Sequence, residues 1–228
     1  MKVVLEEKRK ENEGVYSLVF QTEEPVSWQA GQYMVLNIPH ANPDDRGETR
    51  HFTISSAPFQ KKPMITTHYL AEEGSSFKRA LFAKKQGDTV EVLRIDGEFT
   101  LNKEYKKLAF IAGGIGITPY HAMLLELAKE KDDRDVILIY SNKDKNHIAF
   151  KDTLERLEKE YNSLKLVNIF SPRRADTNLI KEVVPDMVER AFYLSGPIRL
   201  VKAVEEVLQQ LNISRDHIRK DYFPRVDE

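Results

Sequence analysis

Residues 108–120 read Leu108-Ala-Phe-Ile-Ala-Gly-Gly-Ile-Gly-Ile-Thr-Pro-Tyr120, and this stretch decides the fold. Five apolar residues lead into a turn with three glycines, and helical spacing follows. The order predicts a strand, a tight turn and a helix, with Thr118 as N-cap and Pro119 at the first helical position. Backbone amides in such a turn can approach a phosphate closely. A purely structural turn fits equally well, because the spacing departs from G-x-G-x-x-G.

From residue 107 onward, apolar strands alternate with helical patterns. The expected strands are 108–112, 136–140, 164–170, 191–194 and one near 217–223, and the expected helices are 120–130, 150–161, 178–188 and 198–211. Alternation of this kind predicts an α/β, Rossmann-like domain whose parallel five-stranded sheet is covered by helices on both faces. Ligands bind such a sheet at the carboxyl ends of its strands.

The residues before 103 have a different pattern, with short segments rich in β-branched and aromatic residues. The expected strands are 3–11, 15–21, 33–38, 50–55, 64–69 and 89–94, with one helix at 76–84. Six strands at this spacing predict a small antiparallel barrel or sandwich. We therefore expect two domains, an N-terminal antiparallel β-barrel at 1–103 and the α/β domain at 104–228.

Composition narrows the possible functions. The 228 residues carry a net charge of −1, which gives no general electrostatic reason to bind nucleic acid or an anionic membrane. No apolar stretch approaches the roughly 20 residues of a membrane span, and the charged N-terminus does not fit a secretion signal, so we expect a cytoplasmic protein. The absence of cysteine excludes thiolate catalysis, Cys-ligated zinc and an iron-sulfur cluster held by this chain. The six scattered histidines predict no metal site.

Two segments of the first half have the chemistry of a nucleotide site. In Arg50-His51-Phe52-Thr53, an arginine can grip a phosphate, a ring can pack on a planar heterocycle, and a hydroxyl can bond to a ring nitrogen. The alternative is an ordinary strand with Phe52 in the core and Arg50 in solvent. A second candidate anion cradle is formed by Gly74, Ser75 and Ser76, although a serine that simply caps a helix fits these residues too.

Taken together, these motifs resemble the ferredoxin-NADP reductase superfamily of flavoenzymes, over nearly the whole chain. No single motif is decisive, but their order and spacing are specific. The motifs that carry the resemblance are Gly31-Gln-Tyr33, Arg50-His-Phe-Thr53, the segment 74–78, Asp96-Gly-Glu-Phe-Thr-Leu101, Gly113-Gly-Ile-Gly-Ile-Thr-Pro119 and Tyr193-Leu-Ser-Gly-Pro197.

The resemblance implies noncovalent FAD, less commonly FMN, in the barrel and NADPH or NADH on the parallel sheet. Arg50 would hold flavin phosphate, Phe52 would pack on the isoalloxazine ring, and Thr53 would bond near its N5. Thr53 and Ser195 would be the residues closest to the reacting atoms. The other residues that the resemblance assigns to cofactor binding are His51, Gly74, Ser75, Ser76, Gly113, Gly114, Gly116, Thr118, Gly196 and Pro197.

We expect the residues that decide between NADPH and NADH to lie at the ends of the second and third strands of the sheet. No carboxylate stands directly at the tip of the second strand, which runs into Ser141, whereas the third strand is followed by Ser171, Arg173 and Arg174. A serine and two arginines could clamp the extra phosphate of NADPH. The alternative is a solvated loop.

The C-terminus departs from the family pattern, because Arg225 and Val226 stand where Gly-Tyr is expected after an aromatic residue. Phe223 could cover the flavin or nicotinamide pocket, or it could anchor the last strand. The whole chain is thus expected to be an NAD(P)H-dependent flavin oxidoreductase. Its separate acceptor would be a ferredoxin, a flavodoxin, a haem or iron-sulfur protein, or a small molecule. The alternatives are a noncatalytic nucleotide-binding subunit or sensor, and a reductase of free flavins.

Overall fold

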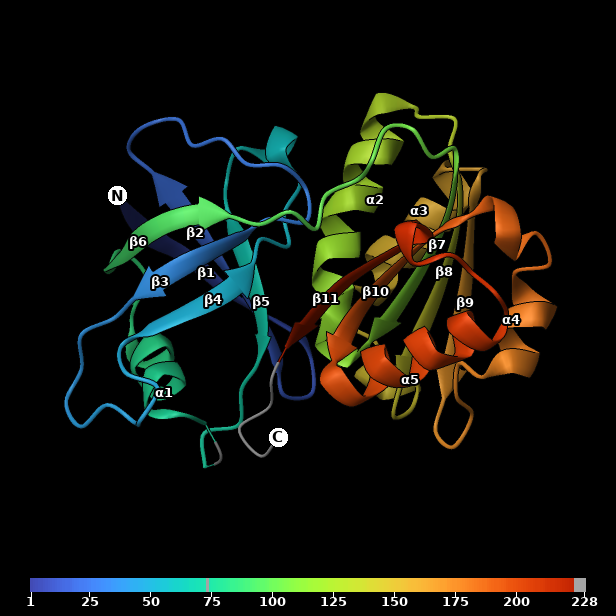
Figure 1. The fold of residues 1–228 in the computed structure, drawn as a ribbon. Helices are drawn as coiled ribbons and strands as arrows, with labels where there is room; N and C mark the ends of the chain where they lie inside the picture. Colours follow the sequence, from blue (N-terminus) through green and yellow to red (C-terminus); the bar gives the residue numbers. More distant parts are fainter. Residues whose placement is uncertain (73, 224–228) are drawn as a thin grey trace.

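The computed structural model describes residues 1–72 and 74–223, and of residues 222 and 223 it describes the backbone only. Two sheets stand side by side, with the N-terminal sheet at the left of Figure 1 and the C-terminal sheet at the right. The first is six-stranded and antiparallel, and the second is five-stranded and parallel. The predicted fold class, an antiparallel barrel followed by a Rossmann-like domain, is therefore confirmed.

The first sheet curls into a barrel. Its strands have the order β4-β3-β6-β1-β2-β5, and a bridge between Ile54 and Ile65 joins the two outer strands. Register shifts in β1 and between Val35 and Leu36 of β3 provide the bends that closure requires. Its elements are β1 (Lys2–Asn12), β2 (Val15–Thr22), β3 (Tyr33–Asn37), β4 (Thr49–Thr53), the 3₁₀ turn η1 (Pro58–Gln60), β5 (Met64–His68), α1 (Ser76–Ala83) and β6 (Thr89–Asp96).

The second sheet has the strand order β11-β10-β7-β8-β9, with every pair parallel. Side chains of β7 alternate between two buried faces, so that Phe110 packs on the side of α2 and α3 while Ile111 packs on the side of α4 and α5. Its elements are β7 (Lys107–Gly113), η2 (Gly114–Ile117), α2 (Thr118–Glu130), β8 (Asp135–Asn142), η3 (Lys145–His147), α3 (Lys151–Glu160), β9 (Leu164–Phe170), α4 (Thr177–Val183), η4 (Met187–Glu189), β10 (Ala191–Pro197), α5 (Ile198–Gln210), η5 (Arg215–His217) and β11 (Ile218–Phe223).

One hydrophobic cluster crosses the seam between the two sheets. Ala30, Met64 and Phe99 from the first half belong to the same buried cluster as Ile117 and Met123 from the second. The two sheets are therefore joined by a common core.

The polar segment between the sheets is also fixed to the second half. The hydroxyl of Tyr193 on β10 accepts a hydrogen bond from the Asn102 amide at 2.9 Å and donates one to the Thr100 carbonyl at 3.3 Å. These bonds hold the connection, drawn in green in Figure 1, against the carboxyl half of the molecule.

Two details differ from the sequence predictions. Thr118 is not an N-cap, because the 3₁₀ turn η2 leads directly into α2 and the Thr118 hydroxyl donates to the Ile115 carbonyl at 3.1 Å. The helix expected at 178–188 ends at Val183. Its C-cap, Val184, precedes Pro185, and a residue before proline is driven out of the helical conformation. The short turn η4 takes the remaining residues.

Candidate functional site

The topology of the parallel sheet identifies where a ligand would enter. From the central strand β7 the chain builds outward through β8 and β9, and it then returns to the other side of β7 as β10. The connections from β7 and β10 therefore leave in opposite directions, and the carboxyl ends of such neighbouring strands form a crevice in open α/β sheets. In this protein the two ends are the turn after Gly113 and the segment 195–197.

Backbone makes up the walls of this crevice. A Cβ atom on Gly116 would lie 2.3 Å from the Ser195 carbonyl oxygen, so only glycine allows the turn to come so near β10. Gly196 has φ of +147°, and a Cβ atom added to it would lie 3.0 Å from the Gly113 carbonyl oxygen. A Cβ atom added to Gly113 would in turn lie 2.7 Å from the Leu200 side chain. The structure thus brings the two predicted nucleotide segments, which are eighty residues apart in sequence, into direct apposition. The predicted residues gathered here are Gly113, Gly114, Gly116, Thr118, Ser195, Gly196 and Pro197.

Ser195 and Asp221 form the polar part of the crevice. Ser195 is fully buried, and its Oγ has no hydrogen-bond partner among the residues that the structure describes. Asp221 on β11 stands beside it in parallel register, and burial raises the pKa of the Asp221 carboxyl to about 6. Sequence reasoning missed Asp221. The signal in the sequence was an aspartate inside the last expected strand, near 217–223, which belongs to a buried sheet.

The second candidate site surrounds Arg50 at the open end of the barrel. Its guanidinium contacts Asp44 at 2.6 Å, donates to three carbonyl oxygens of residues 46–49 at 2.6–3.0 Å, and lies 5.3 Å from the Phe77 ring centroid. The side chain is 15% exposed, so the alternative with Arg50 in solvent is wrong. Within the described part of the chain, its buried Nε has no hydrogen-bond partner. A donor of this kind is available to an anion.

Asp44 connects Arg50 to the start of α1. Its backbone amide donates to Ser76 Oγ at 2.8 Å while its carboxylate holds Arg50. Burial alone would raise the pKa of Asp44, but hydrogen bonds from Arg46 and Arg50 outweigh burial and lower this pKa to about 2. The predicted phosphate residues Arg50 and Ser76 are therefore brought together through an aspartate that sequence reasoning missed.

Lys78 adds a further cation to this pocket. Ser75 caps α1 by accepting from the Lys78 amide at 3.3 Å, and the Lys78 ammonium donates to the His68 carbonyl at 2.7 Å. Burial, and then repulsion from Arg46 and Arg50, lower the pKa of Lys78 to about 8. Three cations close enough to repel one another are an arrangement that a phosphate would stabilise.

The remaining residues of the barrel motif face different environments. Phe52 is 8% exposed and packs in the barrel core, with its ring centroid 5.9 Å from that of Phe77. Thr53 is buried, whereas His51 is exposed and meets Tyr33 edge-on at 5.1 Å. The ordinary-strand alternative is therefore correct for Phe52, which lies in the core, and wrong for Arg50, which does not lie in solvent. The role of Phe52 as a platform for the isoalloxazine stays a prediction.

The two candidate sites meet at the seam. Strand β5 lies beside both β4 and the 114–117 turn. Just beyond β4, the Ser55 carbonyl contacts Nδ1 of His121 on α2 at 2.6 Å. Burial lowers the pKa of His121 to about 4, so its Nδ1 is the donor of a neutral ring at pH 7. Residues 50–55 and 113–118 thus border one junction between the halves.

The predicted phosphate clamp lies at the carboxyl edge of β8 and β9. Ser141, the penultimate residue of β8, pairs with Gly113, and the Ser171 amide donates to the Asn142 carbonyl at 3.2 Å. Arg173 forms an exposed ion pair with Glu182 of α4 at 3.0 Å, and Arg174 is exposed. The four predicted residues, Ser141, Ser171, Arg173 and Arg174, therefore occupy one edge of the sheet.

The structure describes only part of the C-terminal segment for which a role was predicted. The backbone of Phe223 pairs with Pro197 at the end of β11, next to the crevice. The side chain of Phe223 and the departures at residues 225 and 226 lie outside the described residues.

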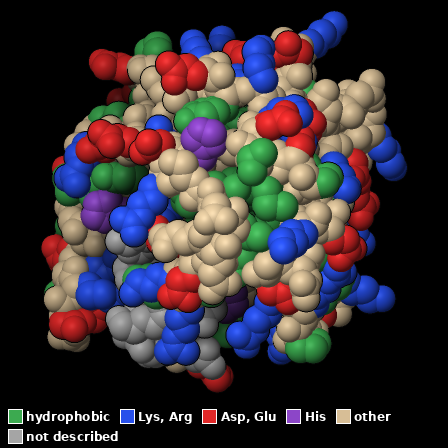
Figure 2. All heavy atoms as spheres, turned by 45° about the vertical axis from the view of Figure 1, so that its right-hand side comes forward, with side chains coloured by type: hydrophobic (Ala, Val, Ile, Leu, Met, Phe, Trp, Pro, Cys, Tyr) green, Lys and Arg blue, Asp and Glu red, His purple; other side chains and the backbone are tan. Residues whose placement is uncertain are grey.

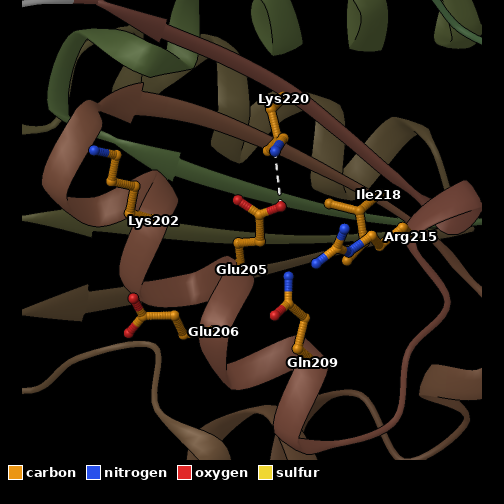
Figure 3. A pocket seen from close by; sticks show the side chains of 7 residues that line it. All are labelled: Lys202, Glu205, Glu206, Gln209, Arg215, Ile218 and Lys220. Atoms are coloured by element: carbon orange, nitrogen blue, oxygen red, sulfur yellow. Dashed lines mark hydrogen bonds and ion pairs between the residues drawn. The ribbon is translucent and has the colours of Figure 1, made fainter.

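A separate hollow of about 440 Å³ lies on the outer side of α5 and β11 (Figure 3). A Lys220–Glu205 ion pair of 2.7 Å spans it, and its lining mixes both signs of charge. It contains none of the predicted cofactor residues. Figure 2 likewise shows Lys and Arg side chains interspersed with Asp and Glu over one face of the molecule. Among residues 1–72 and 74–223, no cluster of three potential metal ligands occurs, and no helix is long and apolar enough to cross a membrane.

Comparison with known proteins agrees with this geometry. The family described as Oxidoreductase NAD-binding domain matches residues 110–206. A flavohemoprotein of Bacillus cereus is 26% identical over 248 aligned positions, which cover 96% of this chain and 60% of that protein. The chain thus spans about three fifths of the length of the curated relatives that it matches.

Solved structures extend the likeness to the whole fold. The flavohem-like FAD/NAD binding domain of nitric oxide dioxygenase from Vibrio cholerae superposes with a TM-score of 0.83 at 22% identity, covering 98% of both chains. Ferredoxin-NADP+ reductase from Plasmodium falciparum with 2'P-AMP gives 0.79 at 18% identity, covering 97% and 95%. Phthalate dioxygenase reductase, described as transferring electrons from pyridine nucleotides to [2Fe-2S], gives 0.81 at 19% identity, covering 100% of this chain and 69% of that one.

The chain has the ferredoxin-NADP reductase fold. The fold that the sequence resemblance implied is therefore confirmed. Within this fold, the Arg50 pocket belongs to the barrel and the glycine crevice belongs to the NAD-binding domain.

Proposed function

We propose that the protein is a flavin-dependent NAD(P)H oxidoreductase. It takes a hydride from NADPH or NADH onto noncovalently bound FAD and passes single electrons to a separate acceptor. The observation that supports this most is the link between two unlike candidate sites. Strand β4 starts at the cationic pocket of Arg50, and just beyond its end the Ser55 carbonyl contacts His121 on α2, the helix that follows the glycine turn. The division into domains at 1–103 and 104–228 is part of the same proposal.

The barrel pocket fits the phosphates of FAD. The buried Nε of Arg50 has no partner among the described residues. Burial, and then repulsion from Arg46 and Arg50, lower the pKa of Lys78, and a bound anion would offset that repulsion. Arg50 and the start of α1, with Gly74, Ser75 and Ser76, would hold the phosphates, while Phe52 and Thr53 would border the ring. When bound, FAD supplies the conversion between a two-electron hydride and single electrons.

The crevice of the second domain fits a nicotinamide nucleotide. Gly116 lets the turn lie directly against β10, where any Cβ would overlap the backbone, and the neighbouring Gly114 leaves open space beside it. The Ser195 hydroxyl is fully buried and lacks a partner within the described chain, so it is free to bond a carboxamide and orient the ring. Gly196 and Pro197 would line the same wall. Fixing the two rings face to face supplies the alignment on which hydride transfer depends.

The preference for NADPH is a further part of the proposal. Arg174, together with Arg173, Ser141 and Ser171, would clamp the 2'-phosphate at the edge of β8 and β9. The acceptor would be a ferredoxin, a flavodoxin, a haem or iron-sulfur protein, or a small molecule. These 228 residues contain no cysteine, so they supply no thiolate ligand for an iron-sulfur cluster. A cytoplasmic location stays a prediction.

The absorption spectrum of the purified protein, followed by anaerobic titration with NADPH and NADH, tests the function. We expect a yellow protein that either nucleotide bleaches, NADPH more efficiently. A protein that stays colourless when FAD is added would contradict the proposal and favour the noncatalytic subunit. Flavin that is reduced in turnover but passes freely through a desalting column would instead indicate a reductase of free flavins.

A further inference from the structure

The hydroxyl of Tyr140 is a buried polar group that contacts the glycine turn. Tyr140 lies on β8, is fully buried, and pairs in parallel register with Ala112 of β7. Its hydroxyl donates to the Gly114 carbonyl at 3.0 Å and accepts from the Ala149 amide at 3.3 Å. One bond donated and one accepted agree with what a phenol can provide. Burial raises the pKa of the Tyr140 hydroxyl, so it keeps the hydrogen that it donates.

The bond from Tyr140 reaches the part of the turn that a ligand can contact. Among residues 111–120, only Gly114 and Ile115 are partly exposed, and the others are buried. A Cβ atom on Gly114 would meet nothing within 4 Å, so there is open space beside it. Gly116 is packed against β10 instead. The peptide between Gly114 and Ile115 is therefore the backbone group of the turn that a bound nucleotide would meet.

The same bond decides which way this peptide faces. The C=O and the N–H of a planar trans peptide point in opposite directions. Because the Gly114 carbonyl is directed at the buried Tyr140 hydroxyl, the Ile115 N–H points away from that hydroxyl. The peptide thus presents a hydrogen-bond donor, rather than a carbonyl oxygen, on the side away from Tyr140.

The backbone of the turn holds this orientation only weakly. Gly114 has φ of +51°, and glycine adopts positive and negative φ about equally readily. The turn η2 is a short 3₁₀ segment, and the hydrogen bonds of such segments have poorer geometry than those of an α-helix. Rotation of the peptide by half a turn would place the Gly114 carbonyl oxygen where the Ile115 N–H now lies. A bound anion would then be repelled.

The strand order indicates which part of a nucleotide would lie at this peptide. In the proposed function, the nicotinamide lies at Ser195 on β10, and the 2'-phosphate lies at the edge of β8 and β9. Strand β7 stands between β10 and β8, so the turn at its end lies between these two places. The group that joins the two nucleosides of NADPH is a pyrophosphate, and NADH has the same group. A backbone N–H is a suitable donor to its oxygen atoms.

We propose that Tyr140 is a positioning residue for the pyridine nucleotide. Its hydroxyl holds the peptide between Gly114 and Ile115 so that the Ile115 N–H donates to a pyrophosphate oxygen of NADPH or NADH. This inference rests on the proposed function and adds to it the side chain that orients the turn. Because both nucleotides carry the pyrophosphate, Tyr140 affects the binding of both and does not decide between them.

Tyr140→Phe tests the inference, because it removes the hydroxyl and keeps the ring. We expect the Kd for NADP+ and the Kd for NAD+ each to rise about tenfold, the size of effect that one hydrogen bond produces. In turnover, the KM for NADPH should rise by the same factor while kcat stays within about twofold, since the hydroxyl acts on binding and not on hydride transfer. Calorimetric titration of the full-length protein and steady-state kinetics measure these values.

A spectroscopic signature separates positioning from a general loss of structure. In the ¹⁵N-labelled full-length protein without nucleotide, we expect one sharp Ile115 amide signal in the wild type. Tyr140→Phe should broaden or double this signal, because its peptide samples both orientations. Unchanged coupling between the amide and α protons of Ile115 in Tyr140→Phe, with a single sharp signal, would overturn the inference.

A second measurement needs only the wild-type protein. NADP+ should move the Ile115 amide proton downfield, as a new hydrogen bond to phosphate requires. NADP+ that binds without moving this signal would overturn the inference, whatever the behaviour of Tyr140→Phe.

The matched control is Tyr161→Phe. Tyr161 is 6% exposed, belongs to the same buried cluster as Tyr140, and donates its hydroxyl hydrogen to the Arg134 carbonyl. Arg134 precedes β8, at the opposite end of the strand from the glycine turn. Tyr161→Phe should therefore leave both Kd values within about twofold, as expected for a distant and independent site. Equal losses of affinity in the two variants would show a general loosening of the domain and would overturn the inference.

The comparison of the two nucleotides gives the remaining outcomes. A rise in Kd confined to NADP+ would place the effect of the hydroxyl at the 2'-phosphate and would overturn the inference. Unchanged Kd values in Tyr140→Phe, in a protein whose flavin NADPH reduces, would overturn positioning and leave the proposed function in place. A wild-type protein that binds neither NADP+ nor NAD+ would overturn both.

Discussion

At the carboxyl ends of β7 and β10 the chain passes so close to itself that a single added carbon on Gly116 would lie 2.3 Å from Ser195. At the start of α1, in contrast, the shape depends on long side chains, with Arg50, Asp44 and Lys78 held by hydrogen bonds and charge. One candidate site is thus built from backbone and the other from ionisable groups. The first should fail by steric overlap and the second by loss of charge, and the predictions below test that contrast.

The largest effect is expected from Gly116→Ala. The new methyl group would overlap the backbone of Ser195 and Gly196, which cannot rotate away as a side chain can. We expect the free energy of unfolding to fall by about 3 kcal/mol, as in overpacked cores, with loss of nucleotide-dependent flavin reduction. Urea unfolding and stopped-flow reduction measure the two effects.

Gly114→Ala is the matched control for Gly116→Ala. Gly114 has φ of +51° but open space around its missing Cβ. The substitution should therefore lower the free energy of unfolding by only about 1 kcal/mol, through backbone conformation. Equal losses in the two variants would show that conformation, and not close packing, explains the glycines.

Arg50→Ala tests the charged half of the seam. It removes the guanidinium and leaves Asp44 without its main side-chain partner. We expect the Kd for FAD to rise about 100-fold, which corresponds to about 2.7 kcal/mol, a typical value for charged hydrogen bonds. Fluorescence titration of the flavin-free protein measures this Kd.

Two variants serve as controls for Arg50→Ala. Arg50→Lys keeps the charge without the planar fork and should give an intermediate Kd. Arg156→Ala removes an exposed arginine of α3 and should leave the Kd within about twofold, since exposed pairs contribute little. An Arg50→Ala protein with wild-type affinity would remove the phosphate site from the barrel.

Asp221→Asn examines the buried aspartate that pairs with Ser195 beside the backbone crevice. Because burial raises its pKa to about 6, the folded protein binds this proton more tightly than the unfolded chain, in which the pKa of aspartate is about 3.9. Asp221 therefore lowers the stability of the wild type as pH rises from about 4 to about 6, and the loss is complete above about pH 7. Asp221→Asn should raise the free energy of unfolding at pH 8 by about 2 kcal/mol and change little at pH 3.5.

Urea unfolding at pH 3.5, 6 and 8 measures this difference. Asp216→Asn, five residues earlier in the turn before β11, provides the comparison and should not reproduce the pH-dependent gain. An Asp221→Asn effect of the same size at every pH would show that the substitution acts through packing rather than through ionisation.

The smallest effect is expected at the proposed phosphate clamp. Arg174→Ala should lower kcat/KM for NADPH about tenfold and leave that for NADH unchanged, because only NADPH carries the additional charge. Glu182→Gln should release Arg173 from its exposed ion pair and raise the NADPH preference about twofold, in line with the small energies of such pairs. Steady-state kinetics with both nucleotides measure these ratios, and an Arg174→Ala protein with unchanged selectivity would eliminate the clamp.

Local patterns made much of the fold predictable. The apolar run at 108–112 predicted the central strand, and the β-branched and aromatic content of 15–21 and 64–69 predicted two barrel strands close to their observed bounds. The end of α4 was missed because the periodicity continued past Val184, where the following proline stops the helix. The role of Thr118 was missed because a 3₁₀ turn, rather than a side-chain cap, starts α2.

Parts of the candidate site depend on contacts that no local pattern contains. Asp44 lies in an irregular loop, and only the folded barrel brings it to Arg50 and Ser76. Ser55 and His121 are sixty-six positions apart in sequence, and they meet only after the two halves pack together. The order of the motifs predicted the fold, but the side chains that shift the pKa values of the candidate site are brought together only by the tertiary structure.

The hydrophobic cluster that crosses the seam has a consequence for how the molecule comes apart. Met64 and Phe99 belong to the same buried cluster as Ile117 and Met123, so separating the halves would expose a hydrophobic surface on each half. The barrel and the Rossmann-like domain should therefore melt in one calorimetric transition. A gene divided within codons 102–107 should yield soluble protein only when both fragments are made in the same cell.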